Sequence, residues 1–244
     1  INYNLLILMK VKYMKKYVYL IAFLFGFTSA VNANGVNLGI SVIGGVFDAD
    51  GAEKFTGDHV SGASADNVTK KTSTEGDDAE TAFYFGSLFV EKELNDMIAV
   101  GFDYVPMNMD SETTENIQRQ GGIDGQFTAD ATNRVSVSFE NMMTAYITAR
   151  SSAGVYAKVG YMEVDLVTNE VLATGGAYGD ATLEGMIIGV GYNHDLDTGA
   201  FVRLEANMME FDDVKLTNSN DSTKSIEATG IEGYGARVSI GRSF

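Results

Sequence analysis

The sequence predicts an all-β chain: an eight-stranded, antiparallel, up-and-down transmembrane β-barrel preceded by a signal peptide. Eight segments after residue 34 alternate apolar residues with small or polar ones at a period of two, which is the period of a β-strand. Long and short polar stretches alternate between these segments, as the loops and turns of a membrane barrel do. No apolar run after residue 33 reaches the roughly 20 residues of a spanning helix, so a membrane span would have to be made of strands.

The N-terminal region contains the three parts of a secretory signal in order. Four lysines follow Met9 within residues 10–16, and the apolar stretch 17–27 comes next. Val31 and Ala33 then occupy the small-residue positions that a signal peptidase requires. The alternative, an N-terminal membrane anchor, needs a longer apolar stretch. We therefore expect residues 1–33 to be upstream residues and a cleaved signal, and residues 34–244 to form the outer-membrane barrel.

The composition excludes several classes of function. Removing the four lysines of residues 10–16 from the 17 Lys and Arg of the chain leaves 13 basic side chains against 33 acidic ones. A net charge near −20 argues against binding nucleic acid. Because the chain contains no cysteine, it has neither disulfides nor thiolate metal sites. One proline and 27 glycines are typical of continuous strands with close backbone approaches.

The first three predicted strands cover residues 35–47, 81–92 and 97–109. One face of the first strand carries Val36, Leu38, Ile40 and Val42. The second strand is apolar on both faces, so its pattern does not show which face points inward. The third strand alternates Ile98, Val100, Phe102 and Tyr104 against Ala99, Gly101 and Asp103. The turn 93–96 joins the second and third strands, whereas the first is followed by the long polar stretch 48–80.

The fourth predicted strand covers residues 133–149, after the polar stretch 110–132. One face is expected to carry Val135, Val137, Phe139, Met143, Ala145 and Ile147, interrupted by Asn141. The opposite face is expected to carry Ser136, Ser138, Glu140, Thr144, Tyr146 and Thr148. The pattern therefore places Glu140 on the inward, polar face.

The last four predicted strands cover 154–166, 183–194, 200–212 and 226–244. Turns at 150–153 and 195–199 alternate with polar stretches at 167–182 and 213–225. Each strand has an apolar face whose members recur every second residue. These members are Val155, Ala157, Val159 and Tyr161, then Met186, Ile188, Val190 and Tyr192, then Val202, Leu204, Ala206 and Met208.

The C-terminal strand carries Tyr234, Ala236, Val238, Ile240 and Phe244 on one face, with Arg242 as its single polar member. An apolar face that runs to an aromatic C-terminal residue is how a transmembrane β-strand ends. The whole of 34–244 resembles the small eight-stranded outer-membrane proteins: the OmpA transmembrane domain, OmpX and the opacity-protein group of the porin family. The chain departs from that family at Arg242, where the family usually has a large apolar residue.

The resemblance implies a location, partners and a membrane-insertion signal. A barrel of this family lies in the outer membrane of Gram-negative bacteria, reached through the periplasm, among lipid and lipopolysaccharide. Its short turns face the periplasm, and a barrel of this size is usually a monomer. Its last strand is read by the barrel-assembly machinery. Carried over to this chain, that signal consists of Tyr234, Val238, Ile240 and Phe244.

The inward faces collect a polar set with three acids and three bases. An eight-stranded barrel is narrow enough for side chains to fill it, and buried charges must pair or meet water. A balanced set therefore predicts a salt-bridged, largely plugged lumen. The alternative is a narrow porin in which the same charges select ions or small solutes. The candidate lumen residues are Asp103, Glu140, Lys158, Arg203, Glu205 and Arg237.

The long loops are candidate sites for a surface interaction. Stretch 48–80 carries nine acids and is long for a structural connector, so stretches 48–80 and 110–132 could bind an extracellular ligand. No stretch has the ligand spacing of a calcium loop; Asp195 to Gly199 contains only a fragment of one. We expect no metal or other cofactor.

Catalysis is not expected. Only His59 and His194 could act as an imidazole base. His59 lies near Asp58 and Ser61 on a loop, without the rigid support that a catalytic group needs. The favoured function is a structural barrel with surface-interaction loops, rather than an enzyme.

Overall fold

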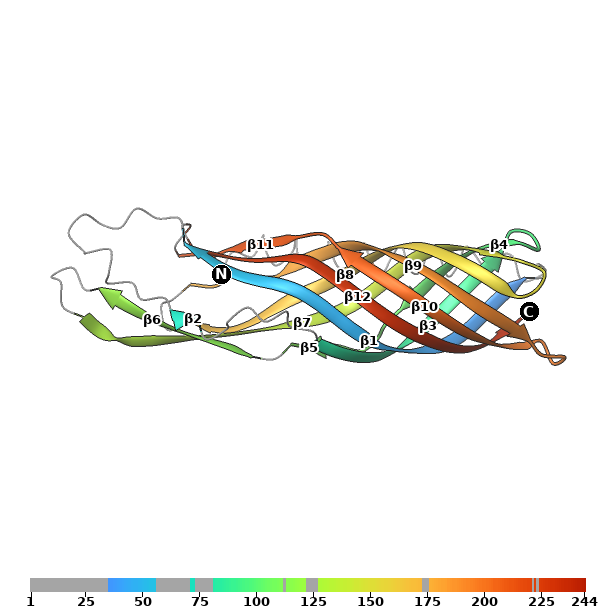
Figure 1. Cartoon of the computed structure of the whole chain (residues 1–244), viewed down its shortest axis with the longest axis horizontal. Coiled ribbons are helices and arrows are strands. Elements are labelled where there is room, and N and C mark those ends of the chain that lie inside the picture. Colours follow the sequence, from blue (N-terminus) through green and yellow to red (C-terminus); the bar gives the residue numbers. More distant parts are fainter. Residues whose placement is uncertain are drawn as a thin grey trace, which may run out of the picture.

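The computed structural model describes residues 35–55, 71–72, 81–111, 113–121, 127–172, 176–220, 222 and 224–244. The predicted signal peptide lies outside the described residues. The described chain is all-β and antiparallel. Eight long strands pair in a closed ring, because β1 (Val36–Phe55) also pairs with β12 (Lys224–Ser243). Figure 1 shows the resulting elongated barrel with strongly tilted strands.

The predicted fold class is confirmed. Round the ring, β1 is followed by β3, β4, β7, β8, β9, β10 and β12. The six strands not yet delimited are β3 (Thr81–Glu93), β4 (Ile98–Tyr104), β7 (Phe127–Arg150), β8 (Val155–Leu172), β9 (Ala181–Asp195) and β10 (Ala200–Phe211). Four short strands add to the sheet at the loop end: β2 (Lys71–Thr72), β5 (Met109–Asp110), β6 (Thr114–Gly121) and β11 (Val214–Thr217).

Three tight turns lie at one end of the barrel, which we call the turn end, as predicted. The Asn95 side chain closes the first turn by accepting hydrogen bonds from the backbone N–H groups of Met97 and Ile98. Gly154 and Gly199 in the other two turns have φ values of 89° and 77°, which a side chain would strain. At the opposite end, β1, β7, β8 and β12 all extend further than predicted.

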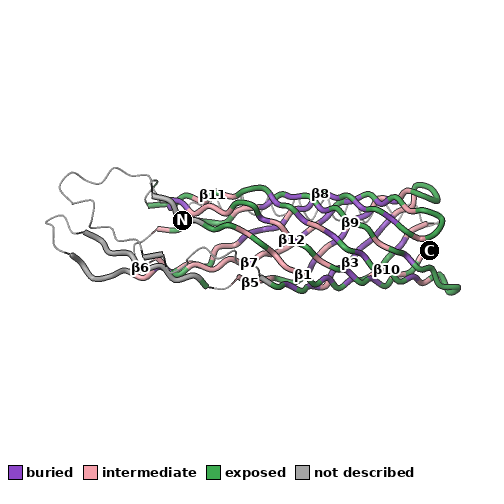
Figure 2. The backbone as a smooth tube through the Cα atoms, viewed as in Figure 1, coloured by how far each residue is buried: buried purple, intermediate pink, exposed green. Residues whose placement is uncertain are grey.

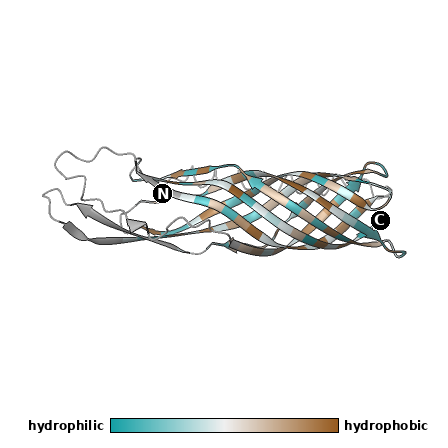
Figure 3. Ribbon diagram, in the orientation of Figure 1, coloured by the Kyte–Doolittle hydropathy of each residue, from teal (hydrophilic) through white to brown (hydrophobic). Residues whose placement is uncertain are grey.

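The alternation of side chains puts apolar residues outside. Exposed apolar residues recur at every second position along the ring strands, in the pattern that Figures 2 and 3 show along the wall. Strand β3, whose orientation the sequence left open, points Phe83, Phe85 and Phe89 inward and Tyr84 and Leu88 outward. The outward set includes Leu38, Ile40, Val42, Ile147, Val159, Ile188, Val190, Val202, Leu204, Val238 and Ile240.

The predicted faces of residues 133–149 are wrong in part, because β7 contains a β-bulge. The pairing of β7 with β8 shifts register between Glu140 and Met143, and Asn141 has a φ of 53°. An extra residue in one strand reverses the alternation on one side of it. Val137 and Phe139 therefore pack against the interior, while Ala145 and Ile147 point outward. The sequence pattern, which put all of these on one face, was wrong there.

Strand β4 ends earlier than the predicted 97–109. It stops at Tyr104, just before Pro106, because proline has no N–H to donate to a ladder. The chain stays with β7 instead: the Val105 N–H donates to the Met142 carbonyl over 2.9 Å, and Met109 pairs with Phe139.

The loop-side half of the interior is an apolar core. Its members are nearly inaccessible, with Ile43, Met162, Val164, Ile187 and Met209 each 1% exposed. Phe47 and Phe83 pack with ring centroids 4.4 Å apart, and Phe83 and Phe85 stack at 5.4 Å. The barrel is thus filled by packed side chains in this half.

Closure of the ring between β1 and β12 predicts that the stability of the barrel depends strongly on Gly45. A β-carbon there would clash with the Tyr234 carbonyl oxygen and lie 2.7 Å from the Gly235 Cα atom. We expect Gly45→Ala to lower the free energy of unfolding, measured by urea titration in lipid vesicles, by about 1–3 kcal/mol. Gly44→Ala is the control, because the nearest atom to its β-carbon is 3.8 Å away. Equal effects of the two changes would contradict this account.

Candidate functional site

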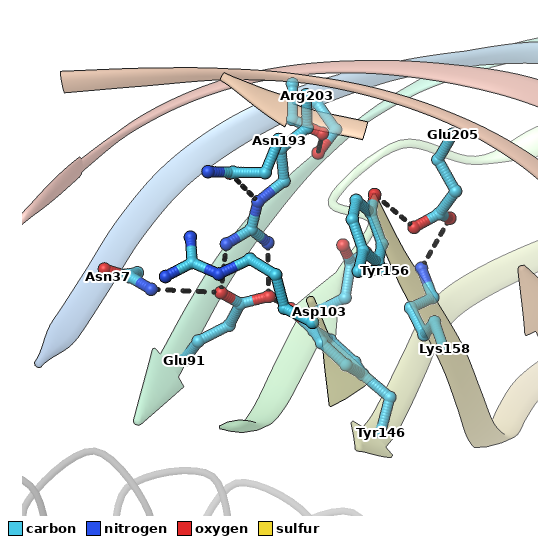
Figure 4. A network of polar contacts seen from close by, with 12 residues as sticks. Asn37, Glu91, Asp103, Tyr146, Tyr156, Lys158, Asn193, Arg203 and Glu205 are labelled. Carbon is cyan, nitrogen blue, oxygen red and sulfur yellow. Dashed lines mark hydrogen bonds and ion pairs between the residues drawn. The ribbon is translucent and has the colours of Figure 1, made fainter. Parts of the chain in front are cut away.

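The candidate site is a cluster of six charged side chains in the turn-side half of the lumen. It draws on five strands of the ring, β3, β4, β8, β10 and β12, each of which contributes inward-facing residues. Figure 4 shows how these side chains converge inside the barrel. We call this set the lumen cluster: Glu91, Asp103, Lys158, Arg203, Glu205 and Arg237.

Arg203 and Glu91 form a two-pronged ion pair. The two terminal nitrogens of Arg203 lie 2.5 and 2.6 Å from the two carboxylate oxygens of Glu91. Arg203 also donates through Nε to Asn193 Oδ1 over 2.7 Å. The Glu91 carboxylate accepts further hydrogen bonds from the Tyr146 hydroxyl at 3.0 Å and Asn37 Nδ2 at 3.3 Å. Several donors therefore satisfy a carboxylate that is 1% exposed.

Aromatic rings surround the Arg203 guanidinium. Its central carbon lies 4.5 Å from the ring centroid of Phe201, 5.6 Å from that of Phe89 and 5.7 Å from that of Tyr156. A guanidinium is attracted to the faces of such rings, and more so away from water. Arg203 is thus fixed by charge, hydrogen bonding and packing together.

Glu205 is the second acid of the cluster. Lys158 Nζ lies 2.7 Å from its Oε1 atom, and the Tyr156 hydroxyl donates to Oε2 over 2.9 Å. The Lys158 and Glu205 side chains are each 3% exposed. Arg237 Nε lies 3.6 Å from the same carboxylate. The Lys158 ammonium also lies over the Tyr146 ring, 5.1 Å from its centroid.

Arg237 connects Glu205 to the third acid, Asp103. A terminal nitrogen of Arg237 donates to Asp103 Oδ2, which also accepts from the Ser87 hydroxyl at 3.1 Å. Three cations therefore meet three carboxylates, and the cluster has no net charge. Desolvating ions is costly, so such a set is tolerated only when each member is paired.

The structure brings together five of the six lumen residues predicted from sequence. Glu140 lies apart. It precedes the β7 bulge, which reverses the alternation, and it accepts a 3.1 Å hydrogen bond from the exposed Asn108 side chain. Sequence reasoning missed Glu91, because its strand is apolar on both faces. A usable signal existed, since Ser87 and Glu91 share a face and a polar pair on one face indicates the lumen.

Two small cavities lie beside the lumen cluster. One of about 20 Å³ is lined by the first turn, including Asn95 and Met97, and reaches Arg203 and Glu91. The other, of about 10 Å³, lies between Arg203, Lys158 and Arg237. A water molecule needs roughly 10–15 Å³, so each cavity has room for about one. The buried apolar core fills the loop-side half of the interior.

Three predicted insertion residues lie on the outer face of β12, and the fourth, Phe244, directly follows the strand. Tyr234, Val238, Ile240 and Phe244 are 47–61% exposed. Arg242, the departure from the outer-membrane pattern, lies over the Phe244 ring at 5.5 Å. Phe244 also ties the chain end to the start of β1, because its N–H donates to the Val36 carbonyl over 2.9 Å.

Two segments at the loop end pack on each other. The Ser219 N–H donates to the Ala177 carbonyl over 2.7 Å, and the Ala177 N–H donates to the Ser219 hydroxyl over 2.9 Å. Tyr178 and Asn218 are buried at this contact. Residues 176–180 and 217–220 therefore form one continuous surface at this end. Parts of stretches 48–80 and 110–132 lie outside the described residues.

The described residues contain no group of three or more side chains able to hold a metal ion. Among the same residues, no helix has the length and apolar character needed to cross a membrane. His194 lies at the turn end, with its ring 6.4 Å from that of Tyr192. His59 lies outside the described residues.

No protein-family model and no curated protein matches the sequence. The barrel is similar to solved structures at low identity. The outer membrane protein OprG of Pseudomonas aeruginosa is 11% identical, with a TM-score of 0.44 over 86% of this chain and 97% of that chain. The Ail protein of Yersinia pestis, crystallised with a heparin analogue, is 11% identical, with a TM-score of 0.37 over 84% and 99%. The outer membrane protease OmpT of Escherichia coli is 10% identical, with a TM-score of 0.37 over 86% and 97%.

The pairing within the lumen cluster predicts that Glu91 is essential for stability. Glu91→Ala leaves the Arg203 guanidinium buried without its carboxylate. We expect a loss of about 3–5 kcal/mol in the free energy of unfolding, measured by urea titration in lipid vesicles. The matched control is Glu140→Ala, which removes a partly exposed carboxylate outside the lumen cluster and should change stability by less than about 1 kcal/mol. A loss for Glu140→Ala as large as that for Glu91→Ala would contradict the pairing.

Proposed function

We propose that the protein is an outer-membrane β-barrel of Gram-negative type with a structural and surface-interaction role and a closed lumen. The observation that carries this proposal is the interior: a neutral ion-pair cluster in one half and a packed apolar core in the other. The apolar outer face supports a membrane location, because lipid-facing residues of such barrels are apolar. We propose a monomer, since the ring is closed by its own first and last strands and needs no strand from a second copy.

The closed lumen follows from two different obstructions in series. Ions moving through the barrel would first have to displace paired charges such as Arg203 and Glu91. They would then have to cross a layer that includes Ile43, Phe85 and Ile187, which are 1–2% exposed. An ion in such a layer loses its hydration with nothing to replace it.

The functional surface is then the loop end. Strands β1, β7, β8 and β12 extend there, and the contact between Ala177 and Ser219 orders part of the surface. Loops carry function on a rigid scaffold more often than the scaffold does. The extracellular ligand would bind through stretches 48–80 and 110–132. The membrane partners are outer-membrane lipid and lipopolysaccharide, and the assembly machinery acts on β12.

The alternative function is a narrow porin that passes ions or small solutes. The two cavities beside the lumen cluster favour it, because they show space on the turn side of the barrel.

Single-channel recording separates the two functions. We expect the refolded protein to be silent in a planar lipid bilayer. We expect Arg203→Ala to remain silent as well, because the apolar core still closes the lumen after the ion pair is lost. Steady, ion-selective openings of the wild-type protein would overturn the closed lumen and establish a narrow porin. Openings of Arg203→Ala alone would show that the ion pair, rather than the apolar core, closes it.

A further inference from the structure

The ladder between β3 and β4 is incomplete. These strands pair only from Leu88 with Tyr104 to Glu93 with Ala99. On its other side, β3 pairs with β1 along its whole length, as far as Thr81 with Phe47. Residues 81–87 therefore have a strand neighbour on one side only, within the described part of the chain. We call the unpaired side of residues 81–87 the β3 seam.

The cause of the β3 seam is Pro106. The proline ends β4, and the chain beyond it follows β7 through the pairing of β5. A single cross-seam contact is described: the Gly86 N–H donates to Met107 Sδ over 3.4 Å. Thioether sulfur is a weak acceptor, so this contact is a poor substitute for a ladder hydrogen bond.

The backbone groups of Ala82 and Tyr84 face the seam. In an antiparallel strand, the N–H and C=O of one residue point to the same side, and the side alternates along the strand. The Glu93 N–H donates to Gly35 on the β1 side, whereas the Gly86 N–H points to the β4 side. Even-numbered residues of β3 therefore direct their backbone groups into the seam. At Ala82 and Tyr84 no strand pairs with them among the described residues.

The surroundings of the seam are those of the apolar outer face. Val42, Tyr84, Leu88 and Met107 are 64%, 80%, 52% and 46% exposed. On this face Gly86 pairs with Val42, and Tyr84 pairs with Gly44. The two glycines add no side chain there. Beneath the seam, Phe85 and Val105 are each 2% exposed, so the seam does not open into the lumen.

The hydrocarbon part of a lipid has no groups that can form hydrogen bonds with backbone N–H and C=O groups. Inside a bilayer an unpaired N–H or C=O costs several kcal/mol, so polar groups facing lipid must find partners. The seam runs from Gly86 outward to Thr81. Ala82 pairs with Val46 of β1, and Val46 pairs with Tyr234 of β12. The next outward-facing residues are Asp48 on β1 and Glu232 on β12. Its outer end thus lies at the edge of the apolar face, within reach of headgroups.

We propose that the β3 seam is a binding site for one outer-leaflet lipid whose headgroup carries both a phosphate and a hydrogen-bond donor. The phosphate accepts from the N–H groups of Ala82 and Tyr84, and the donor reaches their carbonyl oxygens. The acyl chain lies over Gly86, Met107 and Leu88. This inference rests on the membrane location proposed above, but it concerns a specific site rather than general contact with lipid.

The test uses nuclear magnetic resonance of the refolded protein in nanodiscs. The probe lipids are phosphatidylethanolamine, which has a phosphate and a donor, and phosphatidylcholine, which has a phosphate and no donor. We expect a through-space contact between lipid ³¹P and the Tyr84 amide proton, stronger in phosphatidylethanolamine. The Tyr192 amide is the control, because β9 is paired on both sides there.

Variants at two small outward residues complete the test. A β-carbon on Gly86 would lie 3.6 Å from the Ser41 carbonyl oxygen and 3.9 Å from Met107 Sδ, so Gly86→Val fits the wall and fills the seam. We expect it to abolish the ³¹P contact at Tyr84. Ala206→Val, on the fully paired strand β10, should leave the contact unchanged.

Absence of a ³¹P contact at Tyr84 would overturn the lipid site, and so would a contact there with another segment of this chain. A contact with a second copy, detected in a mixed-label sample, would likewise overturn it. Acyl-chain contacts at Tyr192 and Leu204 report separately on the membrane location. If those contacts are present while the phosphate contact is missing, only the lipid site fails. If both are missing, the proposed function fails too.

Discussion

The pairing of β1 with β12 is the interaction on which the rest of the structure depends. It closes the sheet, so that backbone groups along the wall are paired and only side chains remain to meet the surroundings. Closure then divides the side chains of every strand between an outer and an inner set. The outer set is apolar, and the inner set must fill a narrow space completely. The β3 seam departs from this rule, and a single proline accounts for it.

Different kinds of side chain fill the two halves of the interior. The loop-side half uses Phe, Ile, Met and Val side chains, as a soluble protein core does. The turn-side half uses three carboxylates and three cations, each held by more than one partner, with tyrosine hydroxyls and asparagine amides satisfying the remaining oxygens. Neutrality of this set makes its burial tolerable, and the apolar half supports the closed lumen proposed above. A role for the protein is therefore sought on its surface.

Much of the fold and of the lumen cluster could be predicted from the sequence, because a period of two is preserved along most strands. The outward faces of β1, β9, β10 and β12 follow from their alternation, as do the positions of Lys158, Arg203, Glu205 and Arg237. Local departures from the period could not be predicted. The bulge after Glu140 is set by Asn141 in a left-handed conformation. The interruption of the apolar face at Asn141 is its trace in the sequence, but that interruption alone does not indicate an extra residue. Strand β3 is apolar on both faces because its inward side lines the apolar core, which hid Glu91.

The claim that the interior consists of one polar half and one dry half can be tested by water-edited nuclear magnetic resonance of the protein in lipid bilayers. We expect rapid magnetisation transfer from water to Arg203 and Thr148, which line the cavity at the turn end. We expect little transfer to Ile43, Phe85 and Ile187. Equal transfer to both groups would show a continuous water-filled lumen and would contradict the account.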